Sequence, residues 1–217
     1  HPAEQHLDAV VDELLACLHV AGGVLVGDRA DGGLGLGLAG AGCTAHQDLH
    51  VEHRERRLRT ALAEVSGQYE YILIDCPPSL NMLTINALVA ANGVIIAMQC
   101  EYFALEGLAA LVRTIEGVAE TINTDLQIQG ILRTMYDPRN SLTTDVSAQL
   151  RAHFGEKVFR TVVPRNVRLA EAPSHGVPAM YYDKNSRGSK AYMALAGEII
   201  RRAEQQGAPQ PDQAALT

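Results

Sequence analysis

Apolar and polar positions form blocks along the chain that predict strands and helices in turn. Short apolar runs bounded by turn residues predict strands at 71–75, 94–98, 126–135 and 158–163. Apolar positions at helical spacing predict helices at 51–66, 81–91, 104–120, 142–154 and 188–204. Strands that alternate with helices in this way predict an α/β fold, with a mostly parallel sheet and helices on both faces.

The two ends of the chain differ from this pattern. Residues 3–20 have the spacing of an amphipathic helix, whereas residues 21–42 contain nine glycines and predict a flexible loop, because ordering glycine costs entropy. The end of the chain is polar and contains prolines, which predicts disorder. We therefore expect a Gly-rich, partly disordered segment at 1–50, one domain at 51–205 and a disordered tail at 206–217.

Composition excludes some classes of protein and leaves others open. The 217 residues are 47% hydrophobic, which is enough for a sizeable core. The net charge of −7 means that any nucleic-acid contact would depend on a local basic patch. Four cysteines without regular spacing favour a reducing cytoplasm. No apolar stretch has the length of a membrane span and no signal peptide is evident, so we expect a cytoplasmic protein; its start at His1 would fit a fragment or a processed product.

The most informative residue of the predicted sheet is Asp75. It follows the apolar run 71–74 and precedes Pro77 and Pro78, which cannot donate ladder hydrogen bonds and so end the strand. A carboxylate at this place lies where open α/β sheets bind ligands. It would equally suit a turn residue that accepts backbone N–H groups. Residue types alone leave both interpretations open.

A Gly-rich segment before such a strand calls for a test for a phosphate-binding loop. That loop requires the pattern G-K-[ST], because its lysine contacts the β- and γ-phosphates. The sequence contains no lysine before Lys157. Residues 21–42 are therefore not a phosphate loop of this type.

Four residues near the start of the predicted domain could be drawn as a metal site. Cys43, His46, His50 and His53 include histidines spaced to share one face of a helix. No second cluster supports a zinc site, and solvated surface histidines are the simpler interpretation.

Several longer motifs resemble one family. They occur at residues 71–80 (YILIDCPPSL), 99–107 (QCEYFALEG), 134–137 (TMYD), 163–169 (VPRNVRL), 171–176 (EAPSHG) and 186–188 (SRG). Together they are similar to the ParA/MinD group of deviant-phosphate-loop ATPases, and specifically to the ParA (Soj-like) chromosome-partitioning ATPases. The resemblance extends from about Arg54 to Arg202 and implies a P-loop NTPase-like fold.

The resemblance implies a nucleotide site with ATP and Mg²⁺ as cofactors. Asp75 matches the carboxylate that acts in catalysis and holds Mg²⁺ through water, which suits a hard cation that keeps most of its waters. Thr134, Met135, Pro164, Arg165 and Asn166 match positions that border adenine. An apolar slot with backbone polar groups is reasonable chemistry for binding a base.

The resemblance also implies partners. Arg139 and Arg168 match positions that bind DNA without sequence preference once an ATP-bound homodimer forms, which arginine–phosphate contacts can provide. A ParB-like centromere-binding protein would stimulate hydrolysis, and the protein would associate with the nucleoid. The C-terminal segment lacks the basic amphipathic helix of the membrane-attached branch, so no membrane binding is expected. Cys76 and Cys100 do not match the iron–sulfur branch and are expected to be small buried residues.

The sequence departs from the family pattern in residues 1–53. The family's K-G-G-x-G-K-T-T segment and its D-x-D-P-Q segment are absent there, so we expect the fold to be incomplete, lacking the central strand that precedes the phosphate loop. This would fit either a truncated gene whose first segment is read in the wrong frame or a divergent paralogue. It leaves the enzyme assignment open: we expect no measurable ATP hydrolysis, and the alternative function is a non-catalytic interaction module that pairs with a partner protein.

Overall fold

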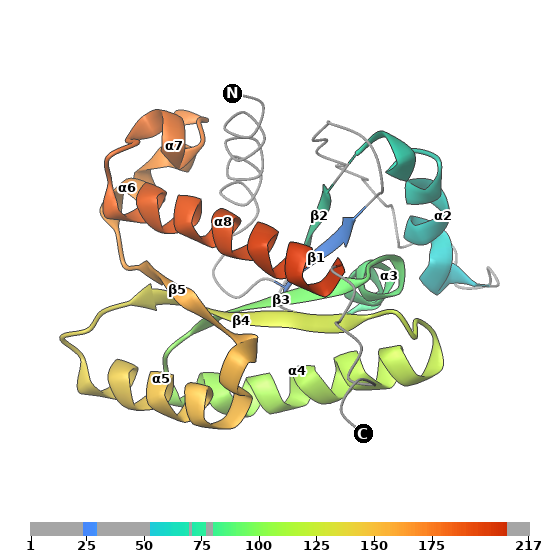
Figure 1. The fold of residues 1–217 in the computed structure, drawn as a ribbon, viewed down its shortest axis with the longest axis horizontal. Helices are drawn as coiled ribbons and strands as arrows, with labels where there is room; N and C mark the ends of the chain where they lie inside the picture. The colour runs from blue at the N-terminus through green and yellow to red at the C-terminus, as the bar shows by residue number, and fades with distance from the viewer. Residues whose placement is uncertain (1–23, 30–52, 70, 77–79, 208–217) are drawn as a thin grey trace, which may run out of the picture.

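The computed structural model describes residues 24–29, 53–69, 71–76 and 80–207, which form one sheet with helices on both faces (Figure 1). The strands are β1 (Val24–Arg29), β2 (Tyr71–Cys76), β3 (Gly93–Gln99), β4 (Gln127–Tyr136) and β5 (Val158–Pro164). The longer helices are α2 (Arg57–Ala63), α3 (Met82–Ala90), α4 (Tyr102–Thr121), α5 (Ser141–Phe154) and α8 (Arg187–Gly207). Shorter helical segments are η1 (Arg54–Arg56), η2 (Ser66–Gln68), η3 (Gly155–Lys157), α6 (Val167–Glu171), η4 (Ala172–His175) and α7 (Ala179–Tyr182).

The sheet has the strand order β2-β1-β3-β4-β5. The pairs β3–β4 and β4–β5 are parallel, whereas β1 is antiparallel to both β2 and β3. Two reversals leave β2 parallel to β3, so β2, β3, β4 and β5 all have their carboxyl ends at the same edge. The predicted mostly parallel α/β sheet is confirmed.

Strand β1 corrects one expectation, because Val24–Arg29 lies in the segment predicted to be a flexible loop. It lies between β2 and β3 and is antiparallel to both, so it is not the parallel strand before a phosphate loop that the fold was expected to lack. Its Val-Leu-Val start has high β propensity despite the glycine-rich surroundings. Pairing on both sides satisfies backbone groups of β2 and β3 that would otherwise lie open. The rest of residues 1–52, including the predicted helix 3–20, and the predicted tail after 207 lie outside the described residues.

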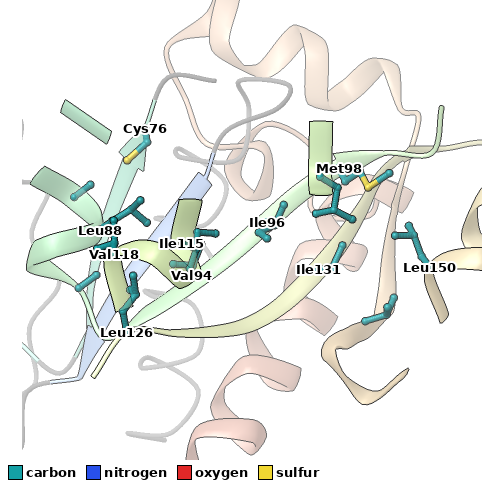
Figure 2. Packing of buried hydrophobic residues seen from close by; sticks show 14 of the residues in the cluster. Cys76, Leu88, Val94, Ile96, Met98, Ile115, Val118, Leu126, Ile131 and Leu150 are labelled. Atoms are coloured by element: carbon teal, nitrogen blue, oxygen red, sulfur yellow. The ribbon is translucent and has the colours of Figure 1, made fainter. Parts of the chain in front are cut away.

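Two cores cover the two faces of the sheet. On one face, α8 packs Tyr192, Leu195 and Ala196 against strand residues that include Ile95 and Leu132. The opposite core joins α3, α4 and α5 to the other face of the strands, and Figure 2 shows the labelled part of this cluster: Cys76, Leu88, Val94, Ile96, Met98, Ile115, Val118, Leu126, Ile131 and Leu150. Residues of β3 alternate between the two cores, as a strand buried on both faces requires.

Helix boundaries agree with the sequence pattern where an asparagine precedes the helix. Asn81 accepts hydrogen bonds from the backbone N–H groups of Leu83 and Thr84, and Asn140 accepts one from Leu142, so both are N-caps. The predicted helix 51–66 is instead divided between η1 and α2. The segment between β5 and α8, for which the sequence pattern predicted no helix, contains α6, η4 and α7.

Strand β5 contains an irregular segment whose backbone groups form hydrogen bonds with side chains on both faces of the sheet. Ile131 pairs with Val158 but Arg133 pairs with Val162, so residues 159–161 are displaced from the ladder. The fully buried guanidinium of Arg133 donates from Nη2 to the carbonyls of Phe159 at 2.8 Å and Arg160 at 3.2 Å. Side chains thus replace the ladder bonds that this segment lacks.

On the other face, Glu198 of α8 completes the same segment. Its carboxylate accepts the backbone N–H groups of Arg160 at 2.8 Å and Thr161 at 2.9 Å. Arg202 donates to Glu198 at 2.9 Å and lies over the ring of Phe159, 4.2 Å from its centroid. Helix α8 is therefore fixed to β5 by a buried polar contact as well as by apolar packing.

Candidate functional site

The predicted site residues lie in segments that follow, or end, the parallel strands. Asp75 is the penultimate residue of β2, Thr134 and Met135 are near the end of β4, and Pro164 ends β5. The structure thus places all of these at the carboxyl side of the sheet, where α/β sheets bind ligands. These residues do not all lie at the same position along the strand direction, as the strand register shows.

Asp75 lies deeper in the sheet than the residues predicted to frame adenine. Across β1 it is level with Ile95, since Leu25 pairs with both. Thr134 is level with Gln99, four positions further along β3. At about 3.3 Å per residue this offset is about 13 Å along the strands.

The Asp75 carboxyl is exposed, yet its pKa is raised above the ordinary value. Partial desolvation is the main cause, and a hydrogen bond with the backbone of Cys76 opposes it. The described part of the chain contains no group of three or more His, Cys, Asp or Glu side chains that could hold a metal ion. Three residues of the possible zinc site, Cys43, His46 and His50, lie outside the described residues, and the fourth, His53, is exposed.

The residues predicted to frame adenine come together at the ends of β4 and β5. Thr134 is buried, whereas Met135 is 45% exposed and has a φ of 49°, a conformation uncommon for a residue with a side chain. The backbone N–H of Arg165 donates to the carbonyl of Tyr136 at 3.2 Å, which joins the loops that follow these strands. Asn166 caps α6, since its Oδ1 accepts the N–H of Arg168 at 2.9 Å.

These two loops also carry the predicted DNA-binding arginines. Arg139 lies in the loop between β4 and α5, and Arg168 in the first turn of α6 after β5. Both are exposed, and Arg165, also exposed, lies between them in sequence and beside Tyr136. The loop contact therefore gathers three guanidinium-bearing residues on neighbouring segments.

Each predicted DNA-binding arginine is paired with carboxylates, which the sequence prediction missed. Arg139 contacts Asp137 at 2.7 Å, and the pKa of Asp137 is lowered to about 2, chiefly by hydrogen bonds from Arg139. Arg168 contacts Glu171 at 2.9 Å and Asp183 at 3.5 Å. Hydrogen bonding from Arg168 also lowers the pKa of Glu171.

The prediction for the cysteines is confirmed: Cys76 and Cys100 are small buried residues. Burial raises the pKa of the Cys100 thiol, and Arg133 opposes this shift. A cavity of about 1090 Å³ lies at the opposite ends of the strands, lined by the starts of β4 and β5 together with α4 and α8. None of the predicted site residues lines it. Among the described residues, no helix is both long and apolar enough to cross a membrane.

Comparison with known proteins agrees with the α/β fold described above. Residues 43–128 match the family model of an AAA domain. The structure is also similar to that of cobyrinic acid a,c-diamide synthase from Mycobacterium smegmatis with bound ADP and magnesium. That match has a TM-score of 0.60 and 33% identity, and it covers 73% of this chain and 57% of the other. The fold is therefore that of the P-loop NTPase class.

Two relatives narrow this class to a family. The chromosome partitioning protein ParA of Caulobacter vibrioides is 56% identical over 151 residues, which are 69% of this chain and 57% of the relative. The sporulation initiation inhibitor protein Soj of Bacillus subtilis is 53% identical over 146 residues, or 67% of this chain and 58% of the relative. The chain belongs to the ParA/Soj family of chromosome-partitioning ATPases, and it spans a little under three fifths of the length of these two relatives.

Proposed function

We propose that the chain works in chromosome or plasmid partitioning as a ParA-type protein that binds DNA without sequence preference. In this proposal it binds ATP with Mg²⁺, forms a homodimer, associates with the nucleoid and acts with a ParB-like centromere-binding protein. We further propose that it does not hydrolyse ATP measurably.

The observation that carries DNA binding is the gathering of Arg139, Arg165 and Arg168 on two adjoining loops. Charge is also distributed unevenly along the sequence. Residues 130–205 contain twelve Lys or Arg and seven Asp or Glu, although the whole chain has 18 and 25. A local basic excess in an acidic chain provides the sequence-independent attraction that DNA phosphates require.

The described residues fit a nucleotide on its base side only. Met135 offers an apolar surface, and Asn166 uses its Oδ1 to cap α6, which leaves its Nδ2 group able to donate to a base. On the phosphate side the sequence has no lysine before Lys157, and Asp75 lies four strand positions from the level of Thr134. These residues therefore do not account for hydrolysis of ATP.

DNA binding is tested with the full chain and a fluorescent duplex of random sequence, by anisotropy at several salt concentrations. We expect Arg139→Ala and Arg168→Ala each to weaken binding about uniformly across sequences and to reduce the salt slope by about one unit. Arg113→Ala removes an exposed arginine of α4, on another part of the surface, and is the matched control. Equal affinities for all four proteins would contradict the assignment of these two arginines.

Hydrolysis is tested with the purified chain, ATP and Mg²⁺, by phosphate release. We expect no turnover above the buffer blank, because the lysine that stabilises charge on the transferred phosphoryl group is not present. Turnover that disappears in Asp75→Ala would contradict this expectation and would restore the enzymatic assignment of Asp75.

The second candidate is a non-catalytic interaction module that pairs with a partner protein. The lysine-free sequence before Lys157 favours it, because it removes the main cationic contact for nucleotide phosphates. Calorimetric titration with ATP and ADP separates the candidates. Binding that Asn166→Ala weakens supports the partitioning proposal, and no affinity at millimolar nucleotide supports the module.

A further inference from the structure

The two arginines proposed to bind DNA are already bound to anions of the same chain. We propose that Asp137 and Glu171 compete with DNA phosphate for Arg139 and Arg168, and so set the affinity of the protein for DNA. This inference rests on the DNA binding proposed above. It assigns a role to two carboxylates that are not themselves expected to touch DNA.

The carboxylate of Asp137 occupies one edge of the Arg139 guanidinium. Nε of Arg139 lies 3.0 Å from Oδ1 of Asp137, and its Nη2 lies 2.7 Å from Oδ2. This is the two-pronged arrangement that arginine also uses to bind phosphate. The same edge cannot make both contacts, so a phosphate that binds there must displace the carboxylate.

Arg168 is occupied in a similar way. Its Nη1 donates to Oε2 of Glu171 at 2.9 Å, and its Nε lies 3.5 Å from Asp183. The hydroxyl of Tyr182 donates to the same Oε2 at 3.2 Å and so holds Glu171 in place. Two carboxylates thus neutralise a guanidinium that DNA would need.

The ion pairs between these arginines and their carboxylates can be displaced. The side chain of Arg139 is 89% exposed and that of Asp137 is 30% exposed. Water and salt screen such pairs, which makes them weak compared with buried ones. A polyanion that contacts several arginines at once can therefore replace them. The carboxylates lower the affinity for DNA without abolishing binding.

Asp137 is held in position by hydrogen bonds of its turn. Its backbone carbonyl accepts the N–H of Asn140 at 3.1 Å, and its Oδ1 accepts the N–H of Arg139 at 3.1 Å. An asparagine can accept the same backbone hydrogen bond. Asp137→Asn therefore removes the charge and keeps the turn, and Glu171→Gln likewise keeps an acceptor for Tyr182.

The test measures DNA affinity of the full chain and its variants, with the fluorescent random-sequence duplex used above. We expect Asp137→Asn and Glu171→Gln each to tighten binding about three- to fivefold at low salt, since each removes a negative charge close to the bound phosphate. The slope of log affinity against log salt should steepen by less than one unit for each arginine released, because the wild-type arginines already contribute part of their phosphate contacts. A carboxylate that served only to stabilise the fold would not change this slope.

Two controls separate release of the arginine from a general change of charge. Glu120→Gln makes the same charge change at an exposed position of α4. Asp137→Asn in an Arg139→Ala background should tighten binding no more than Glu120→Gln does. Circular dichroism spectra that match the wild type would show that each variant is folded.

The outcomes distinguish this inference from the proposed function. If Arg139→Ala weakens binding while Asp137→Asn and Glu171→Gln behave like Glu120→Gln, the competition is refuted and DNA binding stands. If the wild type fails to bind but a variant that carries both Asp137→Asn and Glu171→Gln binds, the inference is supported. If no variant binds DNA at low salt, both are refuted.

Discussion

The carboxylate of Glu198 on α8 accepts two hydrogen bonds from Thr161 on β5, one from its backbone N–H at 2.9 Å and one from its hydroxyl at 2.8 Å. The side chain of Glu198 thus accepts a backbone hydrogen bond that a neighbouring strand would otherwise accept. The contact also protects the displaced segment of β5, because an N–H group without a partner in a buried place is costly.

We predict that Glu198→Ala lowers the free energy of unfolding by about 2 to 4 kcal/mol, because two backbone N–H groups of β5 lose their acceptor and Arg202 loses its ion-pair partner. Urea denaturation followed by circular dichroism measures this change. Glu204→Ala, at an exposed position of the same helix, should change the free energy by less than about 0.5 kcal/mol. Equal effects would show that the contact does not stabilise the fold.

The same residue predicts a dependence on pH. Burial alone would raise the pKa of Glu198, but hydrogen bonds from Thr161, Arg160 and Arg202 outweigh it, and the pKa lies below its ordinary 4.5. Stability from this group is therefore present above pH 4.5 and is lost as pH falls through the lower value in the folded state. The difference in stability between wild type and Glu198→Ala should shrink on acidification below that pH. A difference that stays constant would contradict the assignment.

Among the described residues, Arg133 is a buried cation with no carboxylate paired to it. Its Nη1 donates to Ser147 at 2.8 Å and its Nη2 donates to backbone carbonyls, whereas its Nε has no hydrogen-bond partner in this part of the chain. Burial lowers the pKa of its guanidinium. We predict that Arg133→Ala destabilises the protein by about 2 to 4 kcal/mol, because it leaves a cavity and unsatisfied carbonyls.

Replacing Arg133 with methionine should cost less than replacing it with alanine, because methionine fills the cavity and removes the desolvated charge. Arg113→Ala, an exposed arginine of α4, controls for the loss of charge. Both variants are compared in the same urea titration. A methionine variant as unstable as the alanine variant would mean that the hydrogen bonds outweigh the cost of burying the charge.

Gly130 and Gly107 predict opposite effects of the same substitution. A Cβ at Gly130 would meet the ring of Phe159, whereas at Gly107 in α4 it would meet nothing within 4 Å. We expect Gly130→Ala to destabilise by about 1 to 3 kcal/mol through overpacking. Gly107→Ala should stabilise by about 0.5 to 1 kcal/mol through helix propensity. Thermal unfolding measures both, and a destabilised Gly107→Ala would contradict the packing described for α4.

Met135 stores backbone strain at the candidate adenine side. Its φ of 49° suits asparagine better than methionine, and its side chain is 45% exposed. We predict that Met135→Asn stabilises the protein by about 0.5 to 1 kcal/mol. Leu142→Asn, which also replaces a half-exposed apolar residue, should give no gain. If ATP binds, Met135→Asn should weaken it, as calorimetry can test.

The order of elements after residue 53 could be predicted from the sequence, because each element carries its own signal. The apolar run before Asp75 predicted β2 to within one residue, and Asn140 marks the start of α5. The short helices after β5 were missed because prolines and arginines there resemble a loop. Strand β1 was missed because its three apolar residues are surrounded by glycines.

The candidate site was predictable only where contacts are local. Asp137 and Arg139 are two residues apart across a proline, so their pairing could have been inferred from spacing. The contact of Glu198 with Thr161 joins residues 37 apart and depends on how α8 lies on the sheet. The offset between Asp75 and Thr134 likewise depends on strand register across β1, which no local pattern encodes.

The antiparallel strand β1 has a consequence for how the molecule opens. Among the described strands, β2 pairs only with β1, whereas β3, β4 and β5 form a continuous parallel unit. Separation of β1 from β3 would therefore release β2 with it, while the parallel unit keeps its own ladder. Amide hydrogen exchange should divide accordingly, with fast exchange in β1 and β2 and slow exchange in β3 and β4. The sheet would then unfold as two cooperative units that meet where β1 pairs with β3.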